Sequence, residues 1–250
     1  MVNIMLSGCN GKMGRVLTSL IENDEKSTVI CGVDLNTAGD KYPVYAKFDQ
    51  IKEKPDVIID FSNPAILSSL LDYAISNKIP VVVATTGYSQ EQIEQIKKAS
   101  EEIPVFFTFN MSLGINLLSL LLKKCAEVLG EGYDVEIIEK HHNQKIDAPS
   151  GTAIMLAQAV SEALPYEPEY VYDRHSVRKK REKNEIGIHA VRGGTIVGEH
   201  EVIFAGKDEV ITLSHSAASK EVFAVGALRA AKFIASKPAG MYDMNKMLKN

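Results

Sequence analysis

The chain has 250 residues, 45% of them hydrophobic and 24% charged, which are the proportions of a folded globular protein and exclude a disordered or fibrous one. Its net charge of −4 provides no cationic field for a polyanion, and no apolar run approaches the roughly 18 residues of a membrane span, so we expect no nucleic-acid and no membrane partner. Three widely spaced cysteines and an N-terminus without a charged leader favour a cytoplasmic protein.

The first 110 residues alternate short apolar runs with helical patterns. The apolar runs, which we predict to be strands, cover residues 2–6, 28–33, 57–60, 81–84 and 105–107. Helices are predicted over residues 12–22, after Pro64, and over residues 90–99 with Ser89 as the N-cap. Continuous apolar strands separated by helices are typical of a parallel sheet covered on both faces. The predicted fold class of this part is α/β, with a Rossmann-like doubly wound parallel sheet.

The pattern changes after residue 112, where one long helix is predicted over residues 113–129. Fewer helices separate the strands that follow. These strands are predicted over residues 135–139, 186–191, 198–204 and 210–214, with one helix over residues 152–164. They indicate a second α+β domain with a mixed or antiparallel sheet, and the helix over residues 220–235 is expected to return to the first domain. We therefore assign residues 1–112 and 217–250 to a dinucleotide-binding domain and residues 113–216 to a second domain.

The first predicted strand leads into Gly8, Gly11 and Gly14, spaced as G-x-x-G-x-x-G before a helix. Such glycines permit a tight turn and a close approach of the backbone to a pyrophosphate at the helix N-terminus. Asp34 follows Gly14 by 20 residues, at the end of the second strand, where an acid can accept hydrogen bonds from ribose hydroxyls. This acid favours NADH, whereas Lys12 could offset the 2′-phosphate charge of NADPH. A structural turn with a surface carboxylate is the alternative.

Loops over residues 60–64 and 84–87 follow two further strands, at the edge of the sheet where ligands of α/β proteins bind. We expect them to line the nicotinamide, the alternative being ordinary turns. Cys9 lies inside the glycine loop and is expected to be a passive small residue. The basic segment 174–183 is interpreted as a solvated mobile loop, or as one that steers an anionic ligand.

Residues 139–153 (EKHHNQKIDAPSGTA) combine two histidines, a lysine and a Ser-Gly-Thr turn before a helix. A neutral imidazole and an ammonium close together are suited to proton delivery near neutral pH. The turn at the helix start presents N–H groups and hydroxyls to an anion, so this segment would hold and protonate an acidic substrate. Adjacent histidines on a strand point to opposite faces and no cysteine is nearby, so we expect no metal. A polar loop with structural histidines is the alternative.

The chain resembles the family of 4-hydroxy-tetrahydrodipicolinate reductases, also called dihydrodipicolinate reductases, of the diaminopimelate and lysine pathway. The resemblance covers essentially the whole chain, and the string over residues 139–153 is its most specific part. The other segments that carry it are residues 8–14, 60–62, 84–87, 110–116, 191–194 and 197–200.

This resemblance implies the NADH- or NADPH-dependent reduction of (2S,4S)-4-hydroxy-2,3,4,5-tetrahydrodipicolinate, a cyclic dicarboxylate imine, to tetrahydrodipicolinate plus water. It implies that His141 donates or accepts a proton and that Lys145 is a second proton donor. The substrate carboxylate would be bound by His142, Ser150, Gly151 and Thr152. The cofactor would contact Gly8, Cys9, Asn10, Gly11, Lys12, Met13, Asp34, Ala84, Thr85, Thr86, Thr108, Phe109, Asn110 and Met111. It also implies a homotetramer formed through the sheet of the second domain, making residues 113–216 a substrate-binding and oligomerisation domain.

Two departures from the family pattern stand near the expected cofactor. Met111 replaces an aromatic residue of many members, and Leu35 replaces an arginine that in some members contacts the 2′-phosphate, which again favours NADH. Two other functions stay open. A catalytically silent NAD(H)-binding regulator would have no reason to keep His141 and Lys145 together. A different Rossmann dehydrogenase, for example one acting on an amino acid, should lack the His-His-x-x-Lys string.

Overall fold

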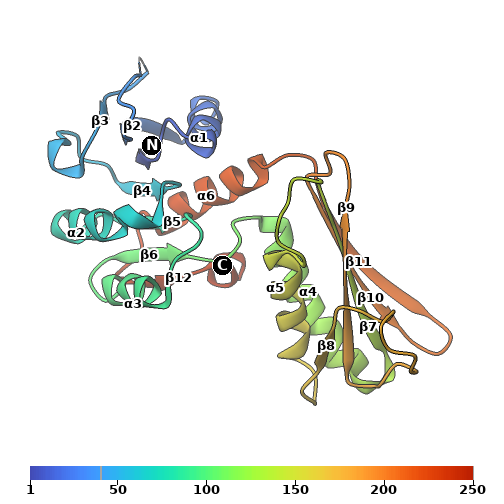
Figure 1. The fold of residues 1–250 in the computed structure, drawn as a ribbon. Coiled ribbons are helices and arrows are strands. Elements are labelled where there is room, and N and C mark those ends of the chain that lie inside the picture. The colour runs from blue at the N-terminus through green and yellow to red at the C-terminus, as the bar shows by residue number, and fades with distance from the viewer. Residues whose placement is uncertain (40, 250) are drawn as a thin grey trace. The chain divides into compact units, whose positions relative to one another are not determined.

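Residues 1–39 and 41–249 are described by a computed structural model, in which the chain divides into two units (Figure 1). The first unit consists of Met1–Leu113 and Glu221–Asn250, and the second of Gly114–Lys220. The sequence assignment differs at residue 113, which it placed with the second domain, and at residues 217–220, which it placed with the first. Residues 217–220 belong to the second unit because its last strand continues to Ala217.

A seven-stranded parallel sheet, in the order β12-β6-β5-β4-β1-β2-β3, forms the centre of the first unit. Its strands are β1 (Val2–Ser7), β2 (Ser27–Val33), β3 (Val44–Tyr45), β4 (Val57–Asp60), β5 (Val81–Val83), β6 (Pro104–Phe107) and β12 (Gly240–Tyr242). The order of the strands reverses between β1 and β4, and in open α/β sheets a ligand site forms outside the carboxyl ends of the strands at such a point.

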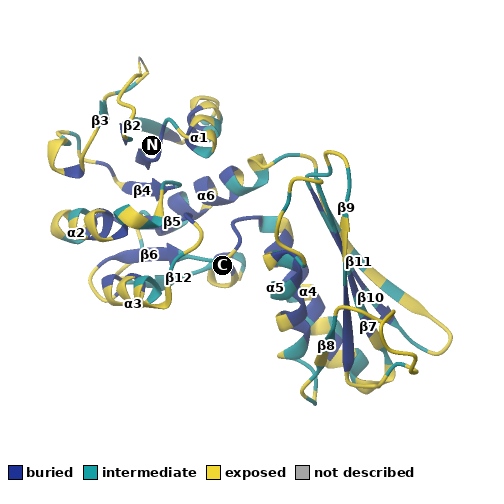
Figure 2. Ribbon diagram, viewed as in Figure 1, coloured by how far each residue is buried: buried dark blue, intermediate teal, exposed yellow. Residues whose placement is uncertain are grey.

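Helices cover both faces of this sheet, and the strands between them are largely buried (Figure 2). One face packs against α1 (Lys12–Glu22), α6 (Glu221–Ile234) and α7 (Met244–Leu248), and the other against α2 (Leu67–Asn77) and α3 (Gln90–Ala99). The predicted doubly wound α/β fold is therefore confirmed. In α6, a Cβ atom on Gly226 would lie 1.7 Å from the Met111 carbonyl oxygen, so only glycine allows this close approach.

Several local predictions for this unit are also confirmed. Ser89 caps α3 in a capping box with Gln92, which stabilises the first turn. A 3₁₀ turn η2 (Pro64–Ile66), capped by Asn63, precedes α2 at the predicted helix start. A second 3₁₀ turn, η1 (Phe48–Gln50), follows β3 and was not predicted. The structure adds β3, β12 and α7, which were not predicted because elements of two to five residues are too short to show a hydrophobic period.

The second unit contains a five-stranded mixed sheet in the order β11-β10-β7-β9-β8, as its sequence pattern predicted. Its strands are β7 (Asp134–His141), β8 (Glu169–Val171), β9 (Glu185–Arg192), β10 (Gly198–Ala205) and β11 (Val210–Ala217). Strand β7 pairs in parallel with β9 and antiparallel with β10, and the short β8 was not predicted. The helices α4 (Leu113–Leu129) and α5 (Gly151–Ser161) cover one face, and the turn η3 (Gly130–Gly132) follows α4.

Alternation along these strands separates a buried face from an outer face. Val135 and Ile137 of β7 and Val202 and Phe204 of β10 point toward the helices and are almost completely buried. Residues between them are partly exposed, and in the described residues no helix covers that side (Figure 2). The strand period of two therefore determines which side chains can meet α5.

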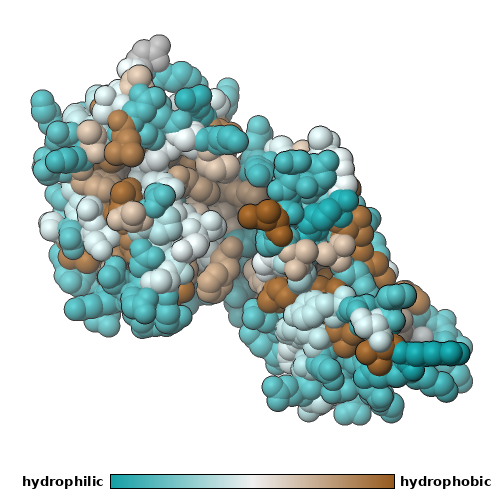
Figure 3. All heavy atoms as spheres, viewed as in Figure 1, coloured by the Kyte–Doolittle hydropathy of each residue, from teal (hydrophilic) through white to brown (hydrophobic). Residues whose placement is uncertain are grey.

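Hydrophilic residues dominate the surface seen in the space-filling view, with hydrophobic residues in separate patches (Figure 3). None of the helices within residues 1–39 and 41–249 is both long and apolar enough to cross a membrane. The large apolar side chains with the greatest exposure include Leu35, Phe109 and Ile146. Each of these lies beside residues that the sequence assigned to a binding site.

Candidate active site

The glycine loop connects β1 to α1 at the carboxyl edge of the parallel sheet. Gly8 has a φ of +78°, and a Cβ atom there would lie 2.5 Å from the Phe61 carbonyl oxygen. A Cβ atom on Gly14 would lie 2.3 Å from the carbonyl oxygen of Gly8. Gly11 is the N-cap of α1 and supplies no capping side chain, so the first amides of α1 have no side-chain cap. Close backbone packing therefore requires glycine here and leaves a helix N-terminus suited to an anion.

Beside this loop lies a cavity of about 990 Å³ within the first unit. Its walls include Gly8, Gly11, Asp34, Leu35, Phe61 and Ser62. The volume lies at the upper end of the range of about 300–1,000 Å³ that is usual for ligand sites. The glycine cradle and the acid at one cavity thus fit a dinucleotide.

Asp34 joins the glycine loop to the segment that follows β2. Its Oδ2 accepts the Asn10 backbone N–H at 3.0 Å and its Oδ1 accepts that of Asn36, also at 3.0 Å. The side-chain amide of Asn10 in turn donates to the carbonyl oxygens of Asn36 and Ala38. A carboxylate oxygen can accept more than one hydrogen bond, so both remain able to accept from a ribose hydroxyl.

The carboxyl group of Asp60 at the end of β4 is buried among hydroxyl groups. Its Oδ1 accepts from Ser62 Oγ at 2.5 Å, and its Oδ2 accepts from Thr85 Oγ1 at 2.6 Å and from Tyr88 OH at 3.4 Å. Burial raises the pKa of Asp60, and the hydroxyl donors oppose that rise only in part. Thr85 also accepts the Ser62 backbone N–H at 2.8 Å, so this network fixes the loops after β4 and β5 relative to each other.

The other residues proposed for cofactor contact differ in exposure. The side chains of Cys9, Ala84 and Met111 lie in the hydrophobic core and that of Met13 packs against it. Burial, followed by the charge of Asp34, raises the pKa of Cys9 to about 11, so it is a neutral thiol. The exposed or partly exposed members are Asn10, Lys12, Thr86, Thr108 and Phe109, and Asn110 is buried.

In the second unit, charged residues occupy one end of the helix-facing side of the sheet. Glu139 and His141 are alternate residues of β7, Arg192 ends β9, and His200 lies on β10. The register pairs His141 with Arg192 and Glu139 with His200. Apolar residues occupy the other end of the same face. The strand period thus brings residues separated by up to 61 positions into one cluster.

Glu139 is completely buried and lies at the centre of this cluster. Its Oε2 accepts from His141 Nδ1 at 2.6 Å and from Arg192 Nη1 at 2.8 Å. Its Oε1 accepts from Arg192 Nη2 at 2.7 Å and from the Ser150 backbone N–H at 2.9 Å. Burial alone would raise the pKa of Glu139, but these hydrogen bonds outweigh burial and hold it below its ordinary value.

Ser150 caps α5 and connects this helix to the cluster. Its Oγ accepts the Ala153 backbone N–H at 3.1 Å and shares a hydrogen bond of 3.0 Å with His200 Nε2. Burial, together with the nearby His141, lowers the pKa of His200 to about 4, so this imidazole is neutral near pH 7. A Cβ atom on Gly151 would meet nothing within 4 Å, so the start of α5 is open at this point.

His142, Lys145 and Thr152 lie around this cluster and are partly exposed. Lys145 Nζ lies 2.8 Å from Asp147 Oδ1, and this ion pair lowers the pKa of Asp147. Arg192 Nη2 donates to the Asp147 carbonyl oxygen at 2.6 Å, which attaches the turn to the buried cluster. The predicted substrate-site residues therefore lie around one connection between β7 and α5, with Glu139 at its base.

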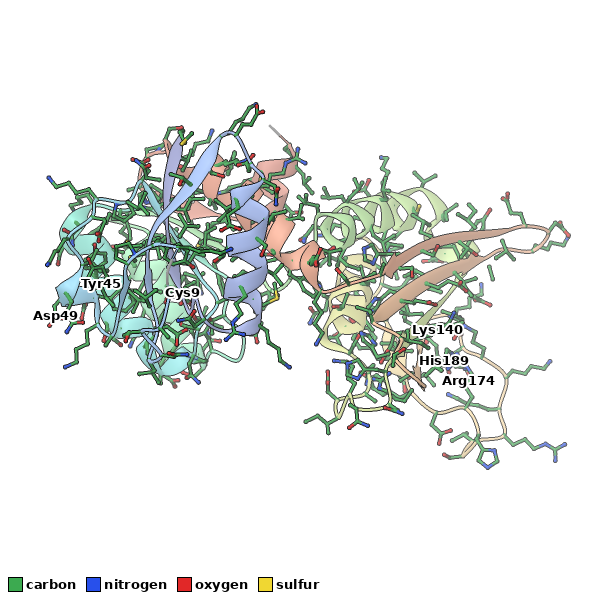
Figure 4. The ribbon with its side chains drawn as sticks, turned by 90° about the horizontal axis from the view of Figure 1, so that it is seen from above. Cys9, Tyr45, Asp49, Lys140, Arg174 and His189 are labelled. Atoms are coloured by element: carbon green, nitrogen blue, oxygen red, sulfur yellow. The ribbon has the colours of Figure 1, made fainter. Side chains whose placement is uncertain are left out.

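The structure changes the interpretation of the basic segment 174–183. Arg174 bridges Glu136 and Glu185, and Arg181 contacts Glu136 as well as two backbone carbonyl groups of the sheet. His189 also contacts Glu136, and Figure 4 shows Arg174 and His189 close together. These two arginines are consequently held on the sheet by carboxylates rather than free in a solvated loop.

Sequence reasoning gave no role to Glu139, Arg192 or His200, and it named Asp60 only as part of the loop 60–64 expected to line the nicotinamide. The strings Val-Arg-Gly-Gly and Val-Gly-Glu-His, which contain Arg192 and His200, were noticed only as parts of the resemblance. The sequence feature that could have identified Arg192 and His200 is a polar residue at a helix-facing position of a strand, where an apolar residue would be expected.

Within residues 1–39 and 41–249, no three His, Cys, Asp or Glu residues are placed to hold a metal ion.

Comparisons with known proteins agree along the whole chain. Residues 2–111 match the family model described as dihydrodipicolinate reductase, N-terminus, and residues 114–248 the one described as dihydrodipicolinate reductase, C-terminus. The 4-hydroxy-tetrahydrodipicolinate reductase of Caldanaerobacter subterraneus subsp. tengcongensis is 53% identical over 249 residues, covering 100% of this chain and 99% of that protein. The protein of the same name from Clostridium novyi is 48% identical over 251 residues, with the same coverage.

A solved structure is similar to the whole chain as well. It is a dipicolinate-bound dihydrodipicolinate reductase from Paenisporosarcina sp. TG-14, with a TM-score of 0.79 and 25% identity. The match covers 98% of this chain and 99% of that one. The sequence resemblance and the fold thus point to the same family.

The buried histidine gives a prediction about stability. The pKa of His200 is about 4 in the folded chain against an ordinary 6.5, so between these values the unfolded chain binds more protons. The free energy of unfolding should therefore fall as the pH is lowered from about 6.5 to about 4. In His200→Gln this loss should be smaller by about 2–3 kcal/mol. Urea unfolding at a series of pH values measures it. The exposed variant His175→Gln is the control, and equal slopes in wild type and His200→Gln would contradict the prediction.

Proposed function

The chain belongs to the dihydrodipicolinate reductase family, and we infer that it reduces (2S,4S)-4-hydroxy-2,3,4,5-tetrahydrodipicolinate to tetrahydrodipicolinate and water with a nicotinamide cofactor. This reaction belongs to diaminopimelate and lysine biosynthesis. Family models covering residues 2–111 and 114–248 favour it over a silent regulator or a dehydrogenase that shares only the fold.

One structural observation supports this function most directly. The buried Glu139 carboxylate contacts both the imidazole of His141 and the backbone amide of Ser150. Glu139 thus holds both an imidazole that can transfer a proton and the start of α5, which can bind an anion. Reducing a dicarboxylate imine needs both groups, because the substrate carries negative charge and the reaction takes up a proton.

The net reaction adds one hydride and one proton to the substrate and releases water. A bound nicotinamide supplies the hydride. We propose that His141 transfers a proton through Nε2, since Nδ1 is held by Glu139. A Cβ atom on Gly198 would lie 3.2 Å from this Nε2, so glycine keeps its surroundings open. Lys145 is proposed as the second donor, and its contact with Asp147 holds the Nζ group beside the start of α5.

For the substrate carboxylate, we propose a site at the start of α5. The backbone N–H groups at Gly151 and Thr152 belong to the first turn of the helix, where the dipole favours an anion. Ser150 is occupied as the helix cap and so orients this turn rather than offering a free hydroxyl. His142 is proposed to contact the same carboxylate. The dipicolinate-bound relative supports a small dicarboxylate ligand.

The cofactor is proposed to bind the first unit, with its pyrophosphate at the glycine loop and its ribose at Asp34. The exposed side chains of Leu35 and Phe109 offer apolar surface for the two rings of the cofactor. The carboxylate of Asp34 favours NADH. Arg15 and Lys41 line a neighbouring cavity of about 420 Å³, but Lys41 is paired with Glu22 at 2.7 Å, which weakens its attraction for a 2′-phosphate. The cytoplasm stays the expected compartment, because the three cysteines are free thiols.

The reaction is tested by generating the substrate from pyruvate and aspartate semialdehyde with a synthase and following NADH or NADPH oxidation. We expect oxidation of at least one cofactor above the control without this enzyme. Absence of oxidation with both NADH and NADPH would contradict the function.

His141→Gln and Lys145→Ala should each lower kcat by about 10²–10⁴-fold, as expected for removal of a positioned proton donor. The matched exposed variants His175→Gln and Lys183→Ala should keep kcat within about twofold, and wild-type kcat in His141→Gln and Lys145→Ala would refute their roles.

Cofactor preference depends on the charge of Asp34. In Asp34→Asn the repulsion of a 2′-phosphate disappears, so the ratio of kcat/KM for NADPH to that for NADH should rise by about tenfold. Steady-state rates with both cofactors measure this ratio. Asp56→Asn is the control, since Asp56 also accepts a backbone N–H, from Asn3 at 2.7 Å, but at the opposite edge of the sheet. An unchanged ratio in Asp34→Asn would mean that this acid does not contact the ribose.

We also propose a homotetramer formed through the outer face of the second sheet. No helix in the described part of the chain covers this face, and Val191 and Val210 are 45% and 62% exposed. Sedimentation velocity should give a species of four chains. Thr212→Arg places a charge on this face and should give smaller species, whereas Lys183→Ala should not. A wild-type chain that sediments as a monomer would contradict the assembly.

A further inference from the structure

An ion pair between the buried Glu139 and the partly exposed Arg192 contacts three different parts of the proposed substrate site. Desolvating two charges costs free energy, and apolar residues of similar volume often stabilise a protein at least as well as an ion pair. Apolar residues occupy the other end of this helix-facing surface, with Val135 and Ile137 preceding Glu139 on the same strand. Stability alone therefore gives no reason for this pair.

Each group of the pair contacts a separate segment of the chain. Glu139 accepts from the imidazole of His141 and from the amide of Ser150, as described above. Arg192 donates through both terminal nitrogens to Glu139 and also to the Asp147 carbonyl oxygen. After Arg192, the Gly193 backbone N–H donates to the His141 carbonyl oxygen at 2.9 Å. The histidine, the lysine turn and the helix start are thus attached to one bidentate pair.

The charge of Glu139 also determines the protonation of the imidazole. A carboxylate with no exposed surface that accepts from Nδ1 requires that nitrogen to carry its hydrogen. In neutral His141 the hydrogen is then on Nδ1 and the lone pair on Nε2. In other proteins, a carboxylate that accepts a hydrogen bond from one ring nitrogen orients catalytic and metal-binding histidines in the same manner.

Resting on the proposed reductase function, we propose that Glu139 and Arg192 are positioning residues for proton transfer. Glu139 holds His141 with Nε2 as the reactive nitrogen. Arg192 keeps Glu139 ionised and in place, and fixes the turn that carries Lys145. Neither residue touches the reacting atoms.

Other titratable groups surround His141 and come from each neighbouring element. Arg192 is on β9, His200 on β10 with its ring centroid 5.2 Å away, His215 on β11, and Lys145 in the turn after β7. The element α5 contributes the hydroxyl of Ser150. Burial lowers the pKa of both His200 and His215, which favours their neutral forms. Among these neighbours, Glu139 is the carboxylate that contacts the His141 ring directly.

The variant Glu139→Gln keeps the side-chain shape and removes the charge. We expect kcat to fall by about 10²-fold, the range seen when orienting partners are removed. The alkaline limb of the kcat–pH profile should move to lower pH by about one unit, because the imidazolium loses its anionic partner. The dissociation constant of NADH, measured by fluorescence, should stay within about twofold because the cofactor is bound by the first unit.

Glu185→Gln is the matched control. Glu185 is also a buried carboxylate of this sheet and is also paired with an arginine, Arg174 Nη1 at 2.6 Å, but at the opposite end of β9 from Arg192. Its replacement should change stability without changing kcat or the pH profile. If the control and Glu139→Gln lose activity equally, or if Glu139→Gln keeps both kcat and its pH profile, the positioning role is wrong.

Two further measurements decide the proposal if Glu139→Gln does not fold. The ¹⁵N NMR signals of the wild-type histidines, with His141 assigned by its absence in His141→Gln, should show the Nδ1–H tautomer in neutral His141. The Nε2–H tautomer would overturn the proposal.

Arg192→Lys keeps the charge but loses the bidentate contact with Glu139. We expect kcat to fall by about tenfold with unchanged NADH binding, and an unchanged kcat would overturn the role of Arg192. Failure of wild type to oxidise either cofactor would instead refute the reductase function, while the tautomer still reports on Glu139.

Discussion

The ionised carboxylate of Glu139 has no exposed surface, so the second unit must provide donors for it from the protein itself. These donors come from the guanidinium of Arg192, the imidazole of His141 and the backbone of Ser150. They belong to two strands and to the start of a helix. A buried charge that lacks one of its donors is costly, so each of these segments is constrained by the other two. The geometry of the proposed substrate site follows from this constraint.

The first unit contains a second buried carboxyl group, and its surroundings differ. Asp60 is held by hydroxyl groups of Ser62, Thr85 and Tyr88, and burial raises its pKa. Glu139 is held by a guanidinium and its pKa is lowered. Hydroxyl donors suit a place where the ligand itself brings negative phosphates. A cationic partner suits a place where a histidine must hold a proton. The two units thus use buried acids in opposite ways that match the ligands proposed for each.

Local patterns in the sequence predicted much of this arrangement. The glycine spacing, Asp34 and the cap Ser89 act within a few residues of the backbone that they stabilise, or at a fixed distance along a βαβ unit. Glu139 and Arg192 are 53 residues apart and meet only because β7 and β9 pair in parallel with a particular register. A single sequence contains no local signal for that register. Strand β12 has three residues, too few for a hydrophobic period, and its pairing with β6 joins segments on either side of the second unit.

The position of the second unit within the sequence also affects how the chain folds during synthesis. Residues of α6 and α7 cover one face of the first sheet, and β12 completes one edge of it, yet all three follow Lys220. That face, with Ile4, Val57 and Phe106, lacks these helices while Gly114–Lys220 is being made. The second unit is a continuous segment, so all of its residues are synthesised before the first unit is complete. On the ribosome, the second unit can therefore complete its folding before the first unit does. The incomplete sheet of the first unit needs protection from aggregation until the last thirty residues emerge.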